Sequence, residues 1–338
     1  MFKYTICFVI ALSAFISAAP REATAQMTPE RFIKKFDADK DGNVSKEEYT
    51  GRRRPFSFFD ADGNDIATGD EINAALGGVA SKLKQKPMLD GQVPPDTIDA
   101  RTRCGLGRFK HDCSIKVAIE KGLFETGLKP KFPDGLGCRR IDEAWAISYS
   151  AKRDQEQYHG GIDMPAPFGT PMLAAADGTV VSKTADPMSY RGIELILRHS
   201  PEETGLPVWT YTQYAHFNEP PTVNVGDRVR MGQNLGPTGN SGFQKSQGSR
   251  SRPRRPAIHF AVWFSDKPGF AADHNRIIPV DGWWMDPNAM YRLKPPFDSA
   301  SLKALPDAEK DVAIPVMLES GETVPANTKL IWPYACRR

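Results

Sequence analysis

The sequence predicts an α+β protein in which a small helical module precedes a mainly antiparallel β domain. Its 338 residues are enough for a sizeable core and one smaller module. An acidic segment dotted with glycines occupies about residues 27–80. From about residue 141 the chain changes to short alternating runs broken by Gly, Pro and Asp, such as GIELILRH and AIHFAVWF. Alternation of this kind is typical of antiparallel strands with one buried face.

The N-terminus has the features of a cleaved export signal. One early lysine is followed by an apolar run of roughly a dozen residues and by Ala23-Thr24-Ala25, a small-residue cleavage motif. We expect residues 1–25 to be a signal peptide and the mature protein to be periplasmic or secreted, without a membrane span. The alternative is an uncleaved anchor, although the run is short for a bilayer. The net charge of +3 gives no reason to expect a nucleic-acid partner.

Removal of the signal leaves an even number of cysteines in an oxidising compartment. They are Cys104, Cys113, Cys138 and Cys336, and two disulfides are expected in one of three pairings. Pairing Cys104 with Cys113 would close a short loop and leave Cys138 to hold the end of the chain. A four-cysteine zinc site is the competing interpretation, but no Cys-x-x-Cys spacing supports it.

The remaining boundaries follow from composition. Residues 81–140 are expected to be a polar, cysteine-containing linker with one short amphipathic helix in CSIKVAIEKGLF. The β core should span residues 141–294. Residues 295–338 are expected to form an extension with a hairpin, tied back by a disulfide at the last cysteine.

The first acidic loop, DADKDGNVSKEE, resembles a calcium-binding EF-hand loop at every key position. Carboxylates occupy positions 1, 3 and 5, glycine makes the turn at position 6 and a glutamate closes position 12. A hard cation prefers such an oxygen cage. The expected ligands of the first calcium ion are Asp37, Asp39, Asp41, Asn43, Ser45 and Glu48.

The second acidic loop, DADGNDIATGDE, begins 23 residues after the first and is the weaker match. Asp65 stands at the turn position where glycine is expected, at a cost of roughly 1 kcal/mol. Its expected calcium ligands are Asp60, Asp62, Asn64, Ile66, Thr68 and Glu71, and an acidic loop without an ion is the alternative. Exported EF-hands bind calcium at ~0.1–1 mM, so one or two ions would stabilise the module rather than act as a switch.

A histidine and an aspartate four residues apart suggest a second metal site. His159 and Asp163 would lie about 13 Å apart on an extended strand, but a bend at Gly160 and Gly161 would bring them to one cation. Zinc with an open position needs a third ligand. His259 is the candidate, because alternation places it on one face of the AIHFAVWF strand with Ala257 and Ala261. By the same alternation, Tyr214 and His216 should point to the same side of the strand TYTQYAHF.

Five motifs in this order resemble the LytM-type, lysostaphin-like zinc metallopeptidases of the bacterial cell wall. The motifs are HGGID with APFGTP, YAHF, VNVGDRVRMGQNLGPTGNSG, IHF and MDPNAMY, and the resemblance covers about residues 141–294. It implies a LytM-like β core, one zinc ion held by His159, Asp163 and His259, and a catalytic His216 beside the water that zinc activates. It also implies that the substrate is a peptide cross-link of peptidoglycan.

One position departs from that family. The last motif is usually His-x-His, but Ala257 stands where the first histidine is expected. Loss of one general acid or base costs ~10²- to 10⁴-fold in rate. His274 or an arginine of the 250–255 loop could compensate, or these residues could be ordinary surface groups. The alternative function is therefore a zinc-binding pseudoenzyme that binds peptidoglycan and activates or positions another wall hydrolase.

Overall fold

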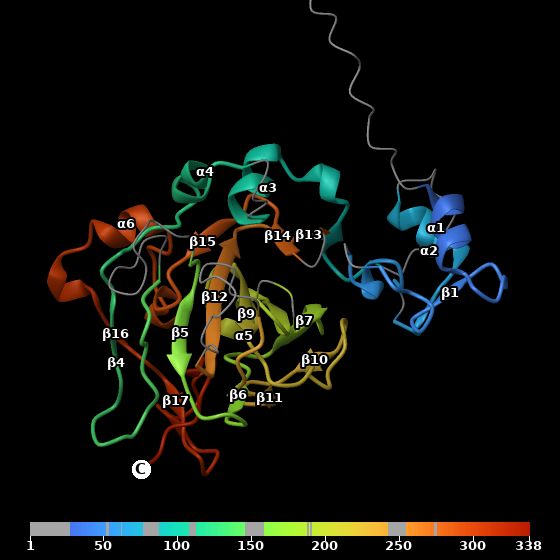
Figure 1. Ribbon diagram of the computed structural model, residues 1–338. Helices are drawn as coiled ribbons and strands as arrows, with labels where there is room; N and C mark the ends of the chain where they lie inside the picture. Colours follow the sequence, from blue (N-terminus) through green and yellow to red (C-terminus); the bar gives the residue numbers. More distant parts are fainter. Residues whose placement is uncertain are drawn as a thin grey trace, which may run out of the picture. The chain divides into compact units, whose positions relative to one another are not determined.

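The computed structural model describes residues 28–51, 54–61, 63–76, 88–107, 113–145, 159–187, 189, 191–242, 255–273 and 276–338. The predicted signal peptide, residues 1–25, lies outside these ranges. The chain divides into two compact units, residues 1–87 and 88–338. Figure 1 labels the helices and strands of both units.

The first unit is built around the two acidic loops. Its elements are helix α1 (Pro29–Phe36), strand β1 (Val44–Ser45), the 3-10 turn η1 (Phe56–Phe58), strand β2 (Ile66–Ala67) and helix α2 (Gly69–Ala75). Strands β1 and β2 pair antiparallel, with Val44 opposite Ala67, so the two loops lie back to back. The buried core of this unit consists of Phe32, Phe36, Val44, Phe59, Ala67 and Ile72. The two short helices agree with the small helical module expected from the sequence, and the aromatic core was not predicted.

The second unit contains a seven-stranded antiparallel sheet. Its strands follow the order β10-β7-β8-β9-β12-β15, and β5 also pairs with β12. The bounds are β5 (Ile162–Pro165), β7 (Gly178–Thr184), β8 (Glu194–His199), β9 (Trp209–Ala215), β10 (Arg228–Val229), β12 (Ala257–Ser265) and β15 (Trp283–Met285). The alternating runs of the sequence therefore predicted the main strands correctly.

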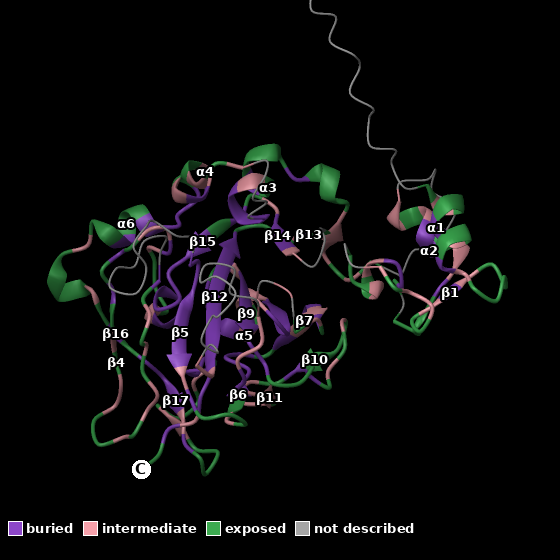
Figure 2. Ribbon diagram, viewed as in Figure 1, coloured by how far each residue is buried: buried purple, intermediate pink, exposed green. Residues whose placement is uncertain are grey.

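Strand β12 has paired strands along both of its edges. It pairs with β9 on one side, and on the other side with β5 at its start and with β15 further along. All nine of its residues are buried, and Figure 2 shows β12 in purple beside the buried strands β5 and β9. A side chain on β12 is thus held rigidly by strands on both edges, which makes it a precise place for a functional group.

Shorter elements surround the sheet. The pairs β11 (Asn234–Pro237) with β6 (Pro171–Leu173) and β13 (Phe270–Asp273) with β14 (Arg276–Pro279) are antiparallel. The other elements are helix α5 (Pro201–Thr204), turn η4 (Ala289–Arg292), helix α6 (Ser299–Lys303) and turn η5 (Asp307–Glu309).

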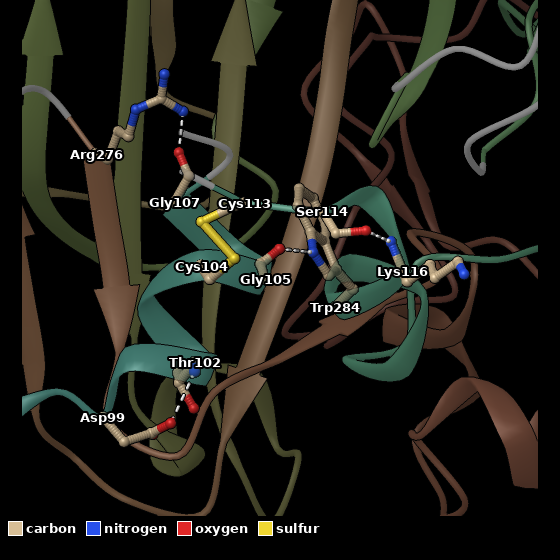
Figure 3. Close-up of a disulfide and its surroundings, with 10 residues drawn as sticks. All are labelled: Asp99, Thr102, Cys104, Gly105, Gly107, Cys113, Ser114, Lys116, Arg276 and Trp284. Carbon is tan, nitrogen blue, oxygen red and sulfur yellow. Dashed lines mark hydrogen bonds between the residues drawn. A yellow bond between two sulfur atoms is a disulfide. The ribbon is translucent and has the colours of Figure 1, made fainter. Parts of the chain in front are cut away.

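The expected linker differs from the structure, because from Met88 onwards it belongs to the second unit. It contains β3 (Gln92–Val93), η2 (Pro95–Thr97), α3 (Ala100–Gly107), α4 (Ile115–Glu120) and β4 (Lys129–Lys131). Strand β3 pairs with β13, and β4 pairs with β16 (Asp311–Ala313). Figure 3 shows the Cys104–Cys113 disulfide beside the indole of Trp284, which donates to the Gly105 carbonyl. Backbone pairing at such sequence distance gives no local signal, so composition alone suggested a linker.

The C-terminal extension also packs on the second unit. Strands β17 (Val316–Met317) and β18 (Thr323–Val324) form a small hairpin, and a disulfide joins Cys336 to Cys138. The amide of Leu173 donates to the Pro333 carbonyl, which attaches the tail beside β6. Within the described ranges, no helix has the length and apolar character needed to cross a membrane.

Candidate metal centre and active site

The glycines after His159 create the bend that the sequence predicted. Gly160 has a φ of 69°, a left-handed conformation that glycine adopts without strain, and the chain then enters β5. This turn brings His159 Nε2 to 3.2 Å from Asp163 Oδ1. Both side chains are buried, at 5% and 2% exposure.

Strand pairing supplies the third group. His259 lies directly opposite Asp163 in the β12–β5 ladder, so both side chains project from the same face of the sheet. His259 Nδ1 is 3.0 Å from the same Asp163 oxygen. A zinc ion with tetrahedral bonds of about 2.0–2.1 Å would need ligand atoms roughly 3.3 Å apart. The donor set and spacing therefore fit one zinc ion.

The protonation of the two histidines suits metal binding. His159 Nδ1 lies 3.0 Å from the carbonyl oxygen of Ala144 and must donate to it, which leaves the lone pair on Nε2, facing Asp163. Burial lowers the pKa of His259 to about 3, against the opposing effect of the Asp163 carboxylate, so this ring is neutral at pH 7. Ala144 could not be predicted from the sequence, because it acts through a backbone carbonyl.

Gly161 makes room for the His259 ring. A β-carbon at this position would lie 2.5 Å from His259 Nε2 and 2.8 Å from the Phe260 carbonyl oxygen. We expect Gly161→Ala to displace the ring and weaken zinc binding about 10- to 100-fold, the usual effect of disturbing a ligand's support. Competition with a chromophoric chelator measures this affinity. Gly137→Ala is the control, since its added carbon would meet only ordinary contacts at 3.7 Å; equal affinities in both variants would contradict the prediction.

His216 is next to this cluster, but the predicted alternation on its strand was wrong. Tyr214 points into the core, where its ring lies 5.3 Å from Phe260 and its hydroxyl accepts from the Ala175 amide. Strand β9 ends at Ala215, and His216 has a φ of 71°. This left-handed turn reverses the side chain, so that its ring centroid lies 5.9 Å from that of His259.

The left-handed conformation of His216 is held by its surroundings. Its Nδ1 donates to the Ser241 carbonyl at 2.6 Å, and the side chain is buried. A left-handed non-glycine residue costs of order 1–3 kcal/mol, and such strain concentrates at functional sites. The hydrogen bond leaves the lone pair on Nε2, as a proton acceptor requires. Ser241, like Ala144, acts through its carbonyl and was missed in the sequence.

Ala257 lies on the His259 face of β12, opposite Pro165, and its methyl group is fully buried. Several residues that could compensate for the missing histidine at position 257 lie outside the described ranges, namely His274, Arg250, Arg252 and Arg254. Arg255 pairs with the carboxylates of Asp142 and Glu143. Its guanidinium therefore ties the segment before Ala144 to the start of β12.

The acidic loops form a separate candidate site in the first unit. Carboxylate oxygens of Asp37, Asp39 and Glu48 lie within 4.8 Å of one another. Glu48 accepts from the Ser45 amide and hydroxyl and from the Ala38 amide, and the Ser45 amide contributes most to lowering its pKa to about 2.

The turns of both acidic loops have the expected conformation. Asp37 accepts from the Gly42 amide, and Asp60 accepts likewise from the Asp65 amide. Gly42 and Asp65 are both left-handed, with φ of 90° and 64°. Asn64 Oδ1 accepts from the Ile66 amide, Thr68 and Glu71 form a capping box at α2, and Asp62 lies outside the described ranges.

Comparison with known proteins places the cluster in a family. The model of peptidase family M23 matches residues 157–269. An uncharacterized metalloprotease of Buchnera aphidicola is 28% identical over 109 residues, which is 32% of this chain and 24% of that protein. The peptidoglycan DD-endopeptidase ShyC of Vibrio cholerae is 36% identical over 89 residues, 26% of this chain and 18% of ShyC. The chain thus spans less than a quarter of the length of these two curated relatives.

Among solved structures, a zinc-containing peptidase from Vibrio cholerae is 23% identical, with a TM-score of 0.30 over 40% of this chain and 36% of the other. The residues matched by the family model include the three members of the buried cluster and His216. The match to the model therefore supports a peptidase M23 domain at residues 157–269 of this chain, and members of that family are zinc-dependent metallopeptidases.

Proposed function

We propose that this chain is an exported zinc endopeptidase that hydrolyses peptide cross-links of peptidoglycan. The observation that carries the proposal is the convergence of His159, Asp163 and His259 on one point, with His216 beside them, inside the matched region. The similarity to a protein named as a peptidoglycan DD-endopeptidase supports this substrate class. The predicted signal peptide supports a periplasmic or secreted location.

Each residue of the centre has a distinct part in this proposal. His159, Asp163 and His259 would hold zinc, which acts as a Lewis acid toward the peptide carbonyl and activates a water molecule. The Ala144 carbonyl fixes the tautomer of His159. His216, oriented by the Ser241 carbonyl, accepts a proton at Nε2 from the attacking water and can return it to the leaving amine.

Digestion of purified, cross-linked peptidoglycan by the mature protein tests this function. We expect fragments whose masses correspond to hydrolysed cross-links, and we expect chelation to abolish them until zinc is restored. Intact cross-links after incubation with protein that carries one zinc per chain would contradict the proposal.

That negative result would favour the pseudoenzyme, for which Ala257 is the specific support. The methyl group of Ala257 provides no acid or base on the face of β12 that carries His259. In this second candidate function, the chain binds stem peptides at the same metal centre and stimulates another wall hydrolase. Sedimentation with peptidoglycan, without cleavage, and stimulation of an added hydrolase would distinguish it from the enzyme.

Calcium binding by the first unit is part of the proposal, with one or two ions in a stabilising role. The left-handed turns and the cluster of Asp37, Asp39 and Glu48 support it. At a dissociation constant of ~0.1–1 mM, 5 mM calcium would stabilise the unit by about 1–2.3 kcal/mol.

We expect titration calorimetry of the full chain to detect calcium binding, and Glu48→Gln to remove the heat from the first loop. Loss of one carboxylate oxygen at the closing position opens the cage. The neighbouring exposed Glu47→Gln leaves the cage intact and serves as the control. Identical titrations for the two variants would contradict calcium binding in this loop.

A further inference from the structure

We propose that Arg191 forms a carboxylate-binding subsite beside the metal centre, and that the chain selects peptides with a free carboxylate near the cleaved bond. This inference rests on the proposed peptidase function and specifies its substrate class. It concerns an arginine that lies outside the motifs that carry the family resemblance.

The guanidinium of Arg191 is only partly engaged. Its Nη1 donates to Oε1 of Gln213, whereas Nη2 is buried without a hydrogen-bond partner. Among the described residues, no carboxylate forms an ion pair with Arg191, and the side chain is half-buried. A buried donor without an acceptor is costly, by about 1–3 kcal/mol, unless a ligand supplies the acceptor.

Gln213 is oriented so that it holds the arginine without neutralising it. Its Nε2 donates to Oε2 of Glu194 at 2.5 Å, so the amide oxygen faces the guanidinium. Gln213 and Glu194 are buried, at 3% and 8% exposure. An amide placed between the carboxylate and the guanidinium leaves the positive charge of Arg191 available to an anion.

Strand register places Gln213 and Glu194 on the same face of the sheet as Asp163 and His259 of the metal cluster. Asp163, His259, Ala215 and Glu194 lie opposite one another in adjacent strands, in that order. Paired residues project from one face, so Glu194 is about two strand spacings, roughly 10 Å, from His259. Gln213 is two residues from Ala215 and shares this face.

Ser241 connects the Arg191 segment with His216. Its hydroxyl accepts from the Ile193 amide at 3.0 Å, and its carbonyl accepts from His216 Nδ1. Arg191 and His216 also approach the same point, since a β-carbon on Gly242 would lie 3.1 Å both from the Arg191 carbonyl carbon and from His216 Nδ1. The backbone of Arg191 is therefore positioned next to the proton-transfer group.

The ligand that fits is a carboxylate. A guanidinium presents planar, parallel donors that match the two oxygens of a carboxylate. A peptide presents such a carboxylate at its C-terminus or on an acidic side chain, and conversion to an amide removes the charge. Arg191 would therefore favour the free acid over the amide in binding, without taking part in bond cleavage.

Two synthetic cross-linked peptides test the inference, identical except that the carboxylate beside the scissile bond is free or amidated. We expect wild-type protein to have a KM about 10- to 100-fold lower for the free acid, as one charge-assisted interaction implies, and a similar kcat for both. Arg191→Met should raise the KM for the free acid by this factor and leave the amide unchanged. Arg191→Lys should retain part of the preference. Arg228→Met, an exposed arginine paired with Glu203, is the control.

Calorimetric binding of the same peptides to zinc-loaded protein provides a readout that does not require turnover. Tighter binding of the free acid, lost in Arg191→Met, supports the subsite even if neither peptide is cleaved and the peptidase function fails. Equal binding and equal KM for the two peptides in wild-type protein overturn the inference, and they leave the peptidase function intact if both are cleaved.

Discussion

Replacement of Asp163 by alanine should abolish stoichiometric zinc binding and lower the rate of cross-link hydrolysis about 10³- to 10⁴-fold. A single oxygen of Asp163 lies within 3.2 Å of both ligand nitrogens, from His159 and His259. Its loss leaves two imidazoles, which cannot complete the three-residue ligand set that a catalytic zinc site requires. Lewis-acid catalysis contributes several kcal/mol, and each 1.4 kcal/mol is a factor of ten.

Zinc content by elemental analysis and hydrolysis of peptidoglycan measure the two effects together. Asp142→Asn is a matched control. The Asp142 carboxylate pairs with Arg255 rather than with the metal centre. The backbone amide of Asp142, which donates to the Asp163 carbonyl, is unchanged by the substitution. The control should retain one zinc per chain. Stoichiometric zinc and full activity in Asp163→Ala would exclude the proposed centre.

Replacement of His216 by alanine should lower the rate about 10²- to 10⁴-fold while zinc remains bound, because this residue contributes proton transfer rather than coordination. The loss should appear in kcat. Unchanged kcat in this variant would show that another group transfers the proton.

His216→Gly provides a second variant with a different stability. It should lose the same activity but be about 0.5–1 kcal/mol more stable than His216→Ala. Relief of the left-handed strain, about 1–2 kcal/mol, exceeds the additional backbone entropy of glycine, about 0.5–1 kcal/mol. Urea denaturation of the two variants measures this difference, and equal stabilities would contradict the role assigned to the φ of 71°.

Several features of the site were predictable because they depend on local pattern. The glycines after His159 predicted the bend, and the alternation in AIHFAVWF placed His259 on one face of a strand. The same rule failed at His216, because period-2 alternation holds only while the strand continues, and β9 ends one residue earlier. The linker expected at residues 81–140 differed because its strands pair with partners more than 170 residues away, such as β3 with β13.

The sequence by itself determined the α+β class, the positions of the main strands along the chain, the acidic loops and the identity of the metal-centre candidates, since each depends on residue type and spacing. Only the tertiary structure decided which groups support them. The carbonyls of Ala144 and Ser241 orient two histidines, and Gln213 holds Arg191, through contacts between segments distant in the chain. Every residue has a backbone carbonyl. Which carbonyl orients a histidine therefore depends on three-dimensional packing and cannot be predicted from residue type.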